Sequence, residues 1–270
     1  MTEQEYNVAD GVRRSDLWKM EDSPEKFKWF SEHPVEQTPA MAFGSACHKM
    51  ILEPATFGDE YAIAPVCDRR TKEGKAILEA FITDNAGKTI LSADDAEIMR
   101  EMEEKIASVP LANELINGEG QTEIPLFWTD PDTGEKCKAK LDRLIQDEDG
   151  RYVIIDYKTA LAAETERFNH EIWKLGYFFQ AGFYTEGLMS VMNLDYRPRF
   201  IFVVEEKKAP YAVNVVEVSE DVMKIGVAKF HELLEKYHEC KMLDVWNGYV
   251  TDIPNETTLP GWFSLNGDEE

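Results

Sequence analysis

Three strand-like segments separated by two strong turn signals lie in the middle of the chain and constrain its fold more than any other feature. The segments are TEIPLFW (122–128), CKAKLDRLI (137–145) and RYVIIDYKT (151–159), and the spacers between them are DPDTGEK and QDEDG. Because these spacers are rich in residues that favour tight turns, the sequence predicts a β-meander over residues 121–159.

Helical patterns surround this meander. The N-terminal third predicts helices in SDLWKMEDSPEKFKWF, with Ser15 as the cap, in MAFGSACHKMILEP, and in SADDAEIMREMEEKIASVP, with Ser92 as the cap. A long helix is expected over about residues 166–192, where the aromatic residues favour a core position, followed by strands in RPRFIFVVEE and YAVNVVEVS and a helix over roughly 219–242. The sequence therefore predicts an α/β fold, a central mixed β-sheet flanked by helices, with a helical N-terminal region.

The 270 residues are expected to form one domain. Within it we expect a mainly helical part over residues 1–118, a sheet-and-helix core over 119–245 and a C-terminal strap over 246–270. No apolar run approaches the roughly 20 residues that cross a bilayer, so no membrane partner and a cytoplasmic location are expected.

The net charge of −23 argues against a protein that coats nucleic acid through a broad basic face. It leaves room for an enzyme with a locally basic channel inside an acidic outer surface. The four cysteines lie far apart and form no CxxC pair, which argues against a zinc knuckle or a disulfide framework.

The strand at the end of the meander carries the most informative side chains. Because alternate residues of a strand share a face, Asp156 and Lys158 emerge together and the intervening Tyr157 points to the opposite face. An Asp-x-Lys pair on a strand is common, and alone it is usually part of a solvated surface. The functional interpretation therefore depends on residues elsewhere in the chain.

A second carboxylate is expected beside this pair. Asp142 lies on the preceding strand, and the turn between the strands is short enough to place it across from Asp156. Two carboxylates on adjacent strands suit a hard divalent cation such as Mg²⁺, which prefers oxygen ligands. Glu123, on the first strand of the meander, could extend the acidic cluster.

Two helical segments add polar side chains. His48 lies on an otherwise apolar helix, and Gln180 and Tyr184 are four residues apart and share a helix face. A lone histidine is more often a core or surface residue than a ligand. Gln180 and Tyr184 could orient a backbone phosphate or a catalytic carboxylate.

The ordered series of these motifs is more specific than any one of them. Gly-x3-His, Glu, Asp, Asp-x-Lys and Gln-x3-Tyr, in this order and with these spacings, resembles the RecB-like branch of the PD-(D/E)xK nuclease superfamily. Within that branch the chain is most similar, from about Ser15 to Trp262, to the RecE-like family of phage and prophage recombination exonucleases (exodeoxyribonuclease VIII). Further segments carry the likeness: Phe43–His48, Leu52-Glu53-Pro54, Ala64-Pro65, Arg69-Arg70-Thr71, Gly74-Lys75 and Asp130–Gly134. One departure from the pattern is Leu141, where proline would precede Asp142.

The resemblance implies a restriction-endonuclease-like core and a Mg²⁺-dependent exonuclease, with Mn²⁺ as a possible substitute. Such an enzyme degrades linear double-stranded DNA from 5′ to 3′ and leaves 3′ single-stranded overhangs for recombination by strand annealing. The implied partners are double-stranded DNA ends, a single-strand-annealing recombinase and further copies of the chain in a toroidal homo-oligomer.

The resemblance also implies roles for individual residues. Four groups are implied as metal ligands: His48, Asp142, Asp156 and the backbone carbonyl of Tyr157. Six residues are implied as catalytic or supporting: Lys158, Asp156, Asp142, Glu123, Gln180 and Tyr184. Lys158 would position or activate the attacking water and stabilise charge at phosphorus, and the sequence leaves open whether it acts as a base or electrostatically.

A basic segment in the N-terminal third is the candidate DNA-binding element. Its residues are Arg69, Arg70, Thr71, Lys72 and Lys75. Thr71 and the neighbouring Gly74 suit close contact with phosphate. The alternative is an ordinary solvated basic turn.

Other functions stay open on the sequence. A related metal-dependent endonuclease or a single-strand nuclease of the same fold would carry the same motifs. A catalytically inactive DNA-end-binding or recombinase-loading module is disfavoured because every expected catalytic residue is present. An acidic DNA mimic would explain the charge but not the Asp-x-Lys pair. An iron–sulfur nuclease would need several cysteines near the C-terminus, where only Cys240 lies.

Overall fold

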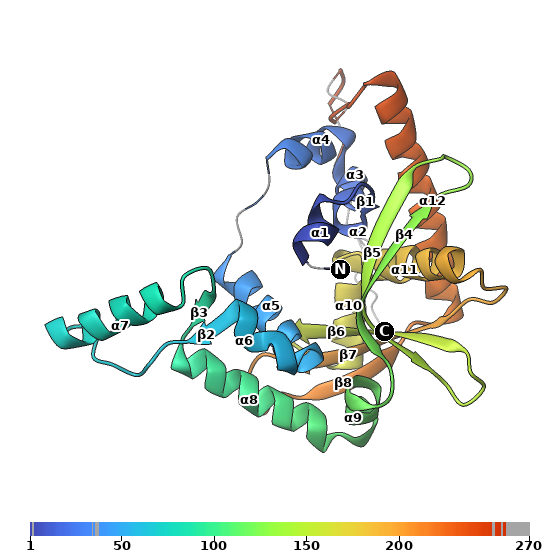
Figure 1. Cartoon of the computed structure of the whole chain (residues 1–270). Helices are drawn as coiled ribbons and strands as arrows, with labels where there is room; N and C mark the ends of the chain where they lie inside the picture. The colour runs from blue at the N-terminus through green and yellow to red at the C-terminus, as the bar shows by residue number, and fades with distance from the viewer. Residues whose placement is uncertain (2, 34, 36–37, 250–251, 255, 258–270) are drawn as a thin grey trace, which may run out of the picture.

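The computed structural model describes residues 1, 3–33, 35, 38–249, 252–254 and 256–257. Most of the expected C-terminal strap, including Trp262, lies outside the described residues. A mixed β-sheet forms the centre of the molecule, and helices flank it (Figure 1). The predicted α/β class with a central mixed sheet is therefore confirmed.

The strands are β1 (Val12–Arg13), β2 (Tyr61–Ile63), β3 (Thr89–Leu91), β4 (Gln121–Thr129), β5 (Lys136–Gln146), β6 (Tyr152–Ala160), β7 (Arg199–Glu206) and β8 (Val213–Glu217). The N-terminal helices are α1 (Glu3–Val8), α2 (Arg14–Leu17), α3 (Lys19–Asp22), α4 (Pro24–Glu32), α5 (Pro39–Leu52), the 3-10 turn η1 (Pro54–Thr56), α6 (Phe57–Glu60), α7 (Lys72–Asp84), α8 (Ala93–Ser108) and α9 (Pro110–Asn117). The later helices are α10 (Thr165–Lys174), α11 (Tyr177–Met192) and α12 (Glu220–Leu243).

The predicted meander is β4, β5 and β6, whose consecutive strands pair antiparallel. β7 then runs parallel to β6 along its length, and β8 pairs antiparallel with β7. The short β1 pairs parallel with β5, whereas β2 and β3 form a separate two-stranded parallel sheet. These pairings place β5 and β6 in the middle of the main sheet.

Alternate residues of β6 and β7 divide the core into two clusters. Ile154, Phe200 and Phe202 pack with side chains of α10, α11 and α12 on one face of the sheet. Ile155 and Val203 pack with side chains of α5, α8 and α9 on the other face. Full burial of one large apolar side chain contributes roughly 1.5–3 kcal/mol to the free energy of unfolding. The two clusters therefore stabilise the sheet from both faces.

The first predicted helix is interrupted. α2 begins at Arg14, with Arg13 before it in an extended conformation, so the prediction of Ser15 as a cap is wrong. Two further short helices follow, and the Ser23 side chain, which accepts a hydrogen bond from the Lys26 N–H, caps the last of them. By contrast, Ser92 caps α8 as predicted, in a reciprocal capping box with Asp95.

The long helix expected over 166–192 is two helices, α10 and α11. Gly176 between them has a φ of 67°, in the left-handed region that favours glycine. A Cβ atom at Gly176 would lie 2.5 Å from the Trp18 ring, so contact with the N-terminal helices also requires glycine here. Among the described residues, no helix is long and apolar enough to cross a membrane.

Candidate active site

The candidate site lies at a gap on one edge of β5. On the edge opposite β4, β1 pairs with Cys137 and Lys138, and β6 pairs with Arg143–Gln146. Within the described part of the chain, residues 139–141 between these two partners pair with β4 alone. A cleft of about 980 Å³ lies over this gap, lined by side chains of β4, β5, β6, α5 and α11.

Asp142 and His48 meet where β6 departs from β5. One carboxylate oxygen of Asp142 accepts a hydrogen bond from the backbone N–H of Tyr157 at 2.9 Å. His48, on α5, places Nε2 2.9 Å from the same oxygen and 3.0 Å from the Tyr157 carbonyl oxygen. Burial alone would lower the pKa of His48, but the Asp142 carboxylate raises it to about 9.

Asp156 and Lys158 emerge on the same face of β6, as predicted, and form an ion pair of 2.6 Å. The amide of Gln180, on α11, donates a hydrogen bond to the other carboxylate oxygen of Asp156. Asp156 is only 1% exposed, and burial together with the nearby Asp142 charge raises its pKa to about 6. Of the two residues of the α11 motif, Gln180 therefore contacts the Asp156 carboxylate.

Glu123 enters the cleft through an unusual backbone conformation. Its φ is 52°, which costs a non-glycine residue strain, and it lies inside β4 opposite Asp142. One carboxylate oxygen lies 4.0 Å from His48 Nδ1 and the other lies 2.5 Å from Lys140 Nζ. Strained non-glycine residues cluster at functional sites, which supports a functional interpretation of Glu123.

Three of these side chains form a group that could hold a metal ion. Ligand atoms of His48, Glu123 and Asp142 all lie within 4.8 Å of one another. Two carboxylates, an imidazole and the adjacent Tyr157 carbonyl suit a divalent cation such as Mg²⁺ or Mn²⁺. Asp156 is not part of this group, because its oxygens contact Gln180 and Lys158 instead.

A Glu123→Gly variant tests this group. We expect the variant to bind Mn²⁺ about tenfold more weakly than the unaltered protein, because one carboxylate is lost. We expect the thermal unfolding temperature to stay the same or rise, because glycine relieves the positive φ and removes a carboxylate whose pKa is raised by burial. Calorimetric titration with Mn²⁺ and thermal unfolding measure the two effects, and unchanged Mn²⁺ affinity would remove Glu123 from the group.

The sequence prediction missed several residues of the cleft. Lys138 and Lys140 share a face of β5 with Asp142, a period-two pattern that was visible in the sequence. Tyr177 packs against the core, as expected for the aromatic residues of this segment, and also lines the cleft, with its ring centroid 4.9 Å from Lys158 Nζ. Arg14 donates hydrogen bonds to the carbonyls of Leu175 and Gly176, at the junction of α10 and α11, and no local pattern indicates this contact.

Of the remaining predicted residues, Tyr184 lines the cleft and the candidate DNA-binding segment does not. Tyr184 lines the cleft beside Gln180, and burial keeps its pKa well above the usual range, so the hydroxyl remains a donor. The five residues of the candidate DNA-binding segment do not line the cleft: Arg69, Arg70, Thr71, Lys72 and Lys75.

The contacts of Thr71 and Gly74 in the candidate DNA-binding segment have a structural explanation. The Thr71 hydroxyl accepts from the Gly74 N–H and donates to the Asp68 carbonyl, so it caps α7. A Cβ atom at Gly74 would lie 2.1 Å from the same carbonyl oxygen, so close backbone packing explains this glycine. Phosphate contact is not needed to account for either residue. Figure 1 shows that α7 projects from the body of the protein.

A family match and one similar solved structure support the fold. Residues 14–253 match the family described as "PDDEXK-like domain of unknown function (DUF3799)". The crystal structure of a "putative exonuclease" from Eubacterium rectale is similar, with a TM-score of 0.59 and 13% identity over 91% of this chain and 88% of that one. The structure of SSO0001 matches with a TM-score of 0.39 and 13% identity over 87% of this chain and 81% of that one. No curated protein matches the sequence.

Proposed function

Because the chain belongs to the PDDEXK-like domain family DUF3799, we propose that it is a metal-dependent nuclease that hydrolyses DNA in the cleft over β5. The observation that carries this proposal is the meeting of two groups at one gap in the sheet. The possible metal-binding group of His48, Glu123 and Asp142 lies beside the ion pair of Asp156 and Lys158.

The residues of the cleft suit phosphodiester hydrolysis. His48, Glu123 and Asp142, with the Tyr157 carbonyl, would hold a divalent cation, which neutralises phosphate charge and lowers the pKa of an attacking water. Lys158, held by its ion pair with Asp156, would donate a hydrogen bond to the phosphate where negative charge develops.

Two side chains of α11 support this arrangement. The Gln180 amide holds one oxygen of Asp156, which leaves the other oxygen directed at Lys158. Tyr184 lines the same cleft and would donate its hydroxyl to a phosphate oxygen.

The finer proposal is a Mg²⁺-dependent 5′ to 3′ exonuclease of the RecE-like kind. It would degrade linear double-stranded DNA and leave a 3′ overhang for a strand-annealing recombinase, as a toroidal homo-oligomer. Support for it comes from the ordered motif series and from the likeness of the fold to the Eubacterium rectale protein.

Linear and circular substrates test the finer proposal. We expect Mg²⁺-dependent release of mononucleotides from linear duplex DNA labelled at one 5′ end, with later release of a 3′ label. A covalently closed circular duplex should stay intact. Cutting of the circle would indicate an endonuclease. Preferential hydrolysis of single-stranded DNA would indicate a single-strand nuclease, and binding of DNA without cleavage would indicate a DNA-end-binding module.

Charge reversal tests the candidate DNA-binding segment. In an Arg69→Glu/Arg70→Glu variant we expect duplex affinity to fall about tenfold and the salt slope to become shallower by about two, because two phosphate contacts are lost. The Arg70 side chain is 91% exposed and pairs with Asp68, two residues away, so the change perturbs little of the fold. Fluorescence anisotropy over a range of salt concentrations measures both quantities, and an unchanged slope would show an ordinary solvated turn.

A further inference from the structure

Tyr157 contacts the candidate active site through both its backbone and its ring. Its N–H donates a hydrogen bond to Asp142 at 2.9 Å, and its carbonyl oxygen lies 3.0 Å from His48 Nε2. Its ring packs against the His48 ring, with 5.5 Å between the two centroids. The position of this one residue therefore affects two members of the possible metal-binding group.

The strand that carries Tyr157 has one neighbouring strand at this point. Within the described part of the chain, β6 pairs with β5 only over Tyr152–Ile155, and from Asp156 onward it pairs with β7 alone. The N–H and carbonyl of Tyr157 contact Asp142 and His48 instead of a neighbouring strand. Because no backbone ladder fixes this edge of β6, the position of Tyr157 depends on β7 and on side-chain contacts.

The Tyr157 hydroxyl makes such a contact with β7. It donates a hydrogen bond of 2.6 Å to Oε2 of Glu205, a length typical of a hydroxyl bound to a carboxylate. In the register of the two strands Tyr157 pairs with Val203, and Glu205 lies two residues further along β7 on the same face. The hydrogen bond therefore links β6 to β7 at the level of the candidate active site.

Glu205 occupies a position where a carboxylate is unfavourable for stability. Its side chain is 0% exposed, and it lies on the face of the sheet where Tyr157 and Val203 join an apolar cluster. Its second carboxylate oxygen, Oε1, has no hydrogen-bond partner among the residues that the structure describes. A buried carboxylate with an unsatisfied oxygen destabilises a fold, and an apolar side chain would avoid this cost. A role other than stability therefore accounts better for Glu205.

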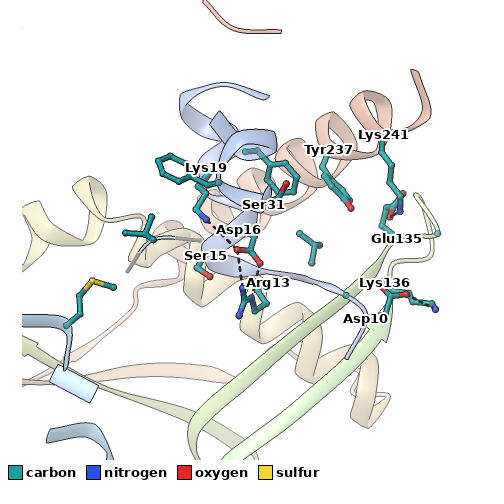
Figure 2. A pocket seen from close by; sticks show the side chains of 17 residues that line it. Asp10, Arg13, Ser15, Asp16, Lys19, Ser31, Glu135, Lys136, Tyr237 and Lys241 are labelled. Atoms are coloured by element: carbon teal, nitrogen blue, oxygen red, sulfur yellow. Dashed lines mark hydrogen bonds and ion pairs between the residues drawn. The ribbon is translucent and has the colours of Figure 1, made fainter. Parts of the chain in front are cut away.

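The charged side chains of the other large cleft differ from Glu205 because they pair with one another. This cleft, of about 940 Å³, lies between the β1–α2 turn, α4, α12 and the tip of the β4–β5 hairpin (Figure 2). The pairs are Arg13–Asp16, Lys19–Asp16, Lys136–Asp10 and Lys241–Glu135. These pairs account for the charges of this cleft without a ligand.

We propose that the buried hydrogen bond between Tyr157 and Glu205 holds the Tyr157 peptide in place for metal binding, so that both are positioning residues of the active site. This inference rests on the proposed metal-dependent nuclease function. Tyr157 would act through its own N–H and carbonyl, which contact Asp142 and His48. Glu205 would act only through the Tyr157 hydroxyl.

Calorimetric titration with Mn²⁺ tests the proposal without relying on catalysis. Because residues that orient metal ligands affect metal affinity, we expect Tyr157→Phe and Glu205→Met each to bind Mn²⁺ about tenfold more weakly. The double variant should bind no more weakly than either single variant, because all three lack the same hydrogen bond. Glu205→Gln keeps an oxygen that can accept from the hydroxyl, so its Mn²⁺ affinity should stay within about twofold of that of the unaltered protein.

Tyr196→Phe is the matched control. The Tyr196 hydroxyl accepts a hydrogen bond from the Tyr152 N–H at the start of the same strand, and Tyr196 does not line the active-site cleft. Its removal should lower the unfolding temperature at most slightly and leave Mn²⁺ affinity unchanged. A merely structural role for the Tyr157 hydroxyl would give the same result in Tyr157→Phe.

Thermal unfolding identifies any variant that fails to fold. Tyr157→Phe leaves the Glu205 carboxylate buried without its donor, whereas Tyr157→Phe/Glu205→Met removes both polar groups and should fold. The double variant therefore decides the matter, and Mn²⁺ affinity equal to that of the unaltered protein would overturn the proposal. Cleavage of linear duplex DNA by the unaltered protein, measured in parallel, separates the two levels. Cleavage together with equal affinities removes only the positioning proposal, whereas no Mn²⁺ binding and no cleavage with any divalent cation would remove the nuclease proposal and this inference with it.

Discussion

Replacement of Asp156 by asparagine is expected to lower the rate of DNA hydrolysis by about a thousandfold or more while the protein stays folded. The Asp156 carboxylate holds Lys158 at 2.6 Å, and asparagine removes the charge that maintains this contact. Asparagine keeps an oxygen that can accept the hydrogen bond from Gln180. Because the buried side chain loses no volume, we expect little change in the unfolding temperature. Initial rates on linear duplex DNA and thermal unfolding measure the two effects.

A matched variant separates this effect from a general loss of negative charge. Asp149 lies in the exposed turn between β5 and β6, so Asp149→Asn should keep full activity. If Asp156→Asn retains more than about a tenth of the activity, Asp156 has no central part in the reaction.

The largest effect on stability is expected for Gly226→Ala, at the contact of α11 and α12. A Cβ atom at Gly226 would lie 2.1 Å from the backbone oxygen of Phe178, so the two helices would have to separate. We expect a loss of about 3 kcal/mol in the free energy of unfolding, which is roughly a 10 °C fall in the unfolding temperature. Activity should fall as well, because α11 carries Gln180 into the active site.

Gly58→Ala is the control for this change. Gly58 lies in α6, and a Cβ atom there would contact nothing within 4 Å. Thermal unfolding should therefore show no loss for Gly58→Ala. Equal unfolding temperatures for Gly226→Ala and the unaltered protein would mean that α11 and α12 do not pack as closely as described.

The parts of the fold that follow from local pattern were predictable. Period-two alternation and two turn signals indicate β4, β5 and β6, and they place Asp142 beside Asp156 because adjacent antiparallel strands fix the register. The same alternation puts Asp156 and Lys158 on one face of β6. His48, Gln180 and Tyr184 required the ordered motif series, because nothing in their local sequence brings them to these strands.

The features that were missed depend on contacts between distant segments. The gap on β5 exists because β6 pairs with β5 only from Arg143 onward, and β1 is too short, at two residues, to cover the rest of that edge. The break between α10 and α11 lies at Gly176, which packs against the ring of Trp18, a residue far away in the sequence. Glu123 joins His48 and Asp142 through a backbone conformation that no residue pattern indicates. Tertiary packing outweighs local propensity at each of these places.

Metal-dependent nuclease activity is tested most directly by release of acid-soluble nucleotides from linear duplex DNA, first in a chelator and then during titration with Mg²⁺. We expect no release in the chelator, a saturable recovery with Mg²⁺ or Mn²⁺, and no recovery in the Asp156→Asn protein. Hydrolysis that the chelator leaves undiminished, or no hydrolysis with any divalent cation, would contradict a metal-dependent nuclease.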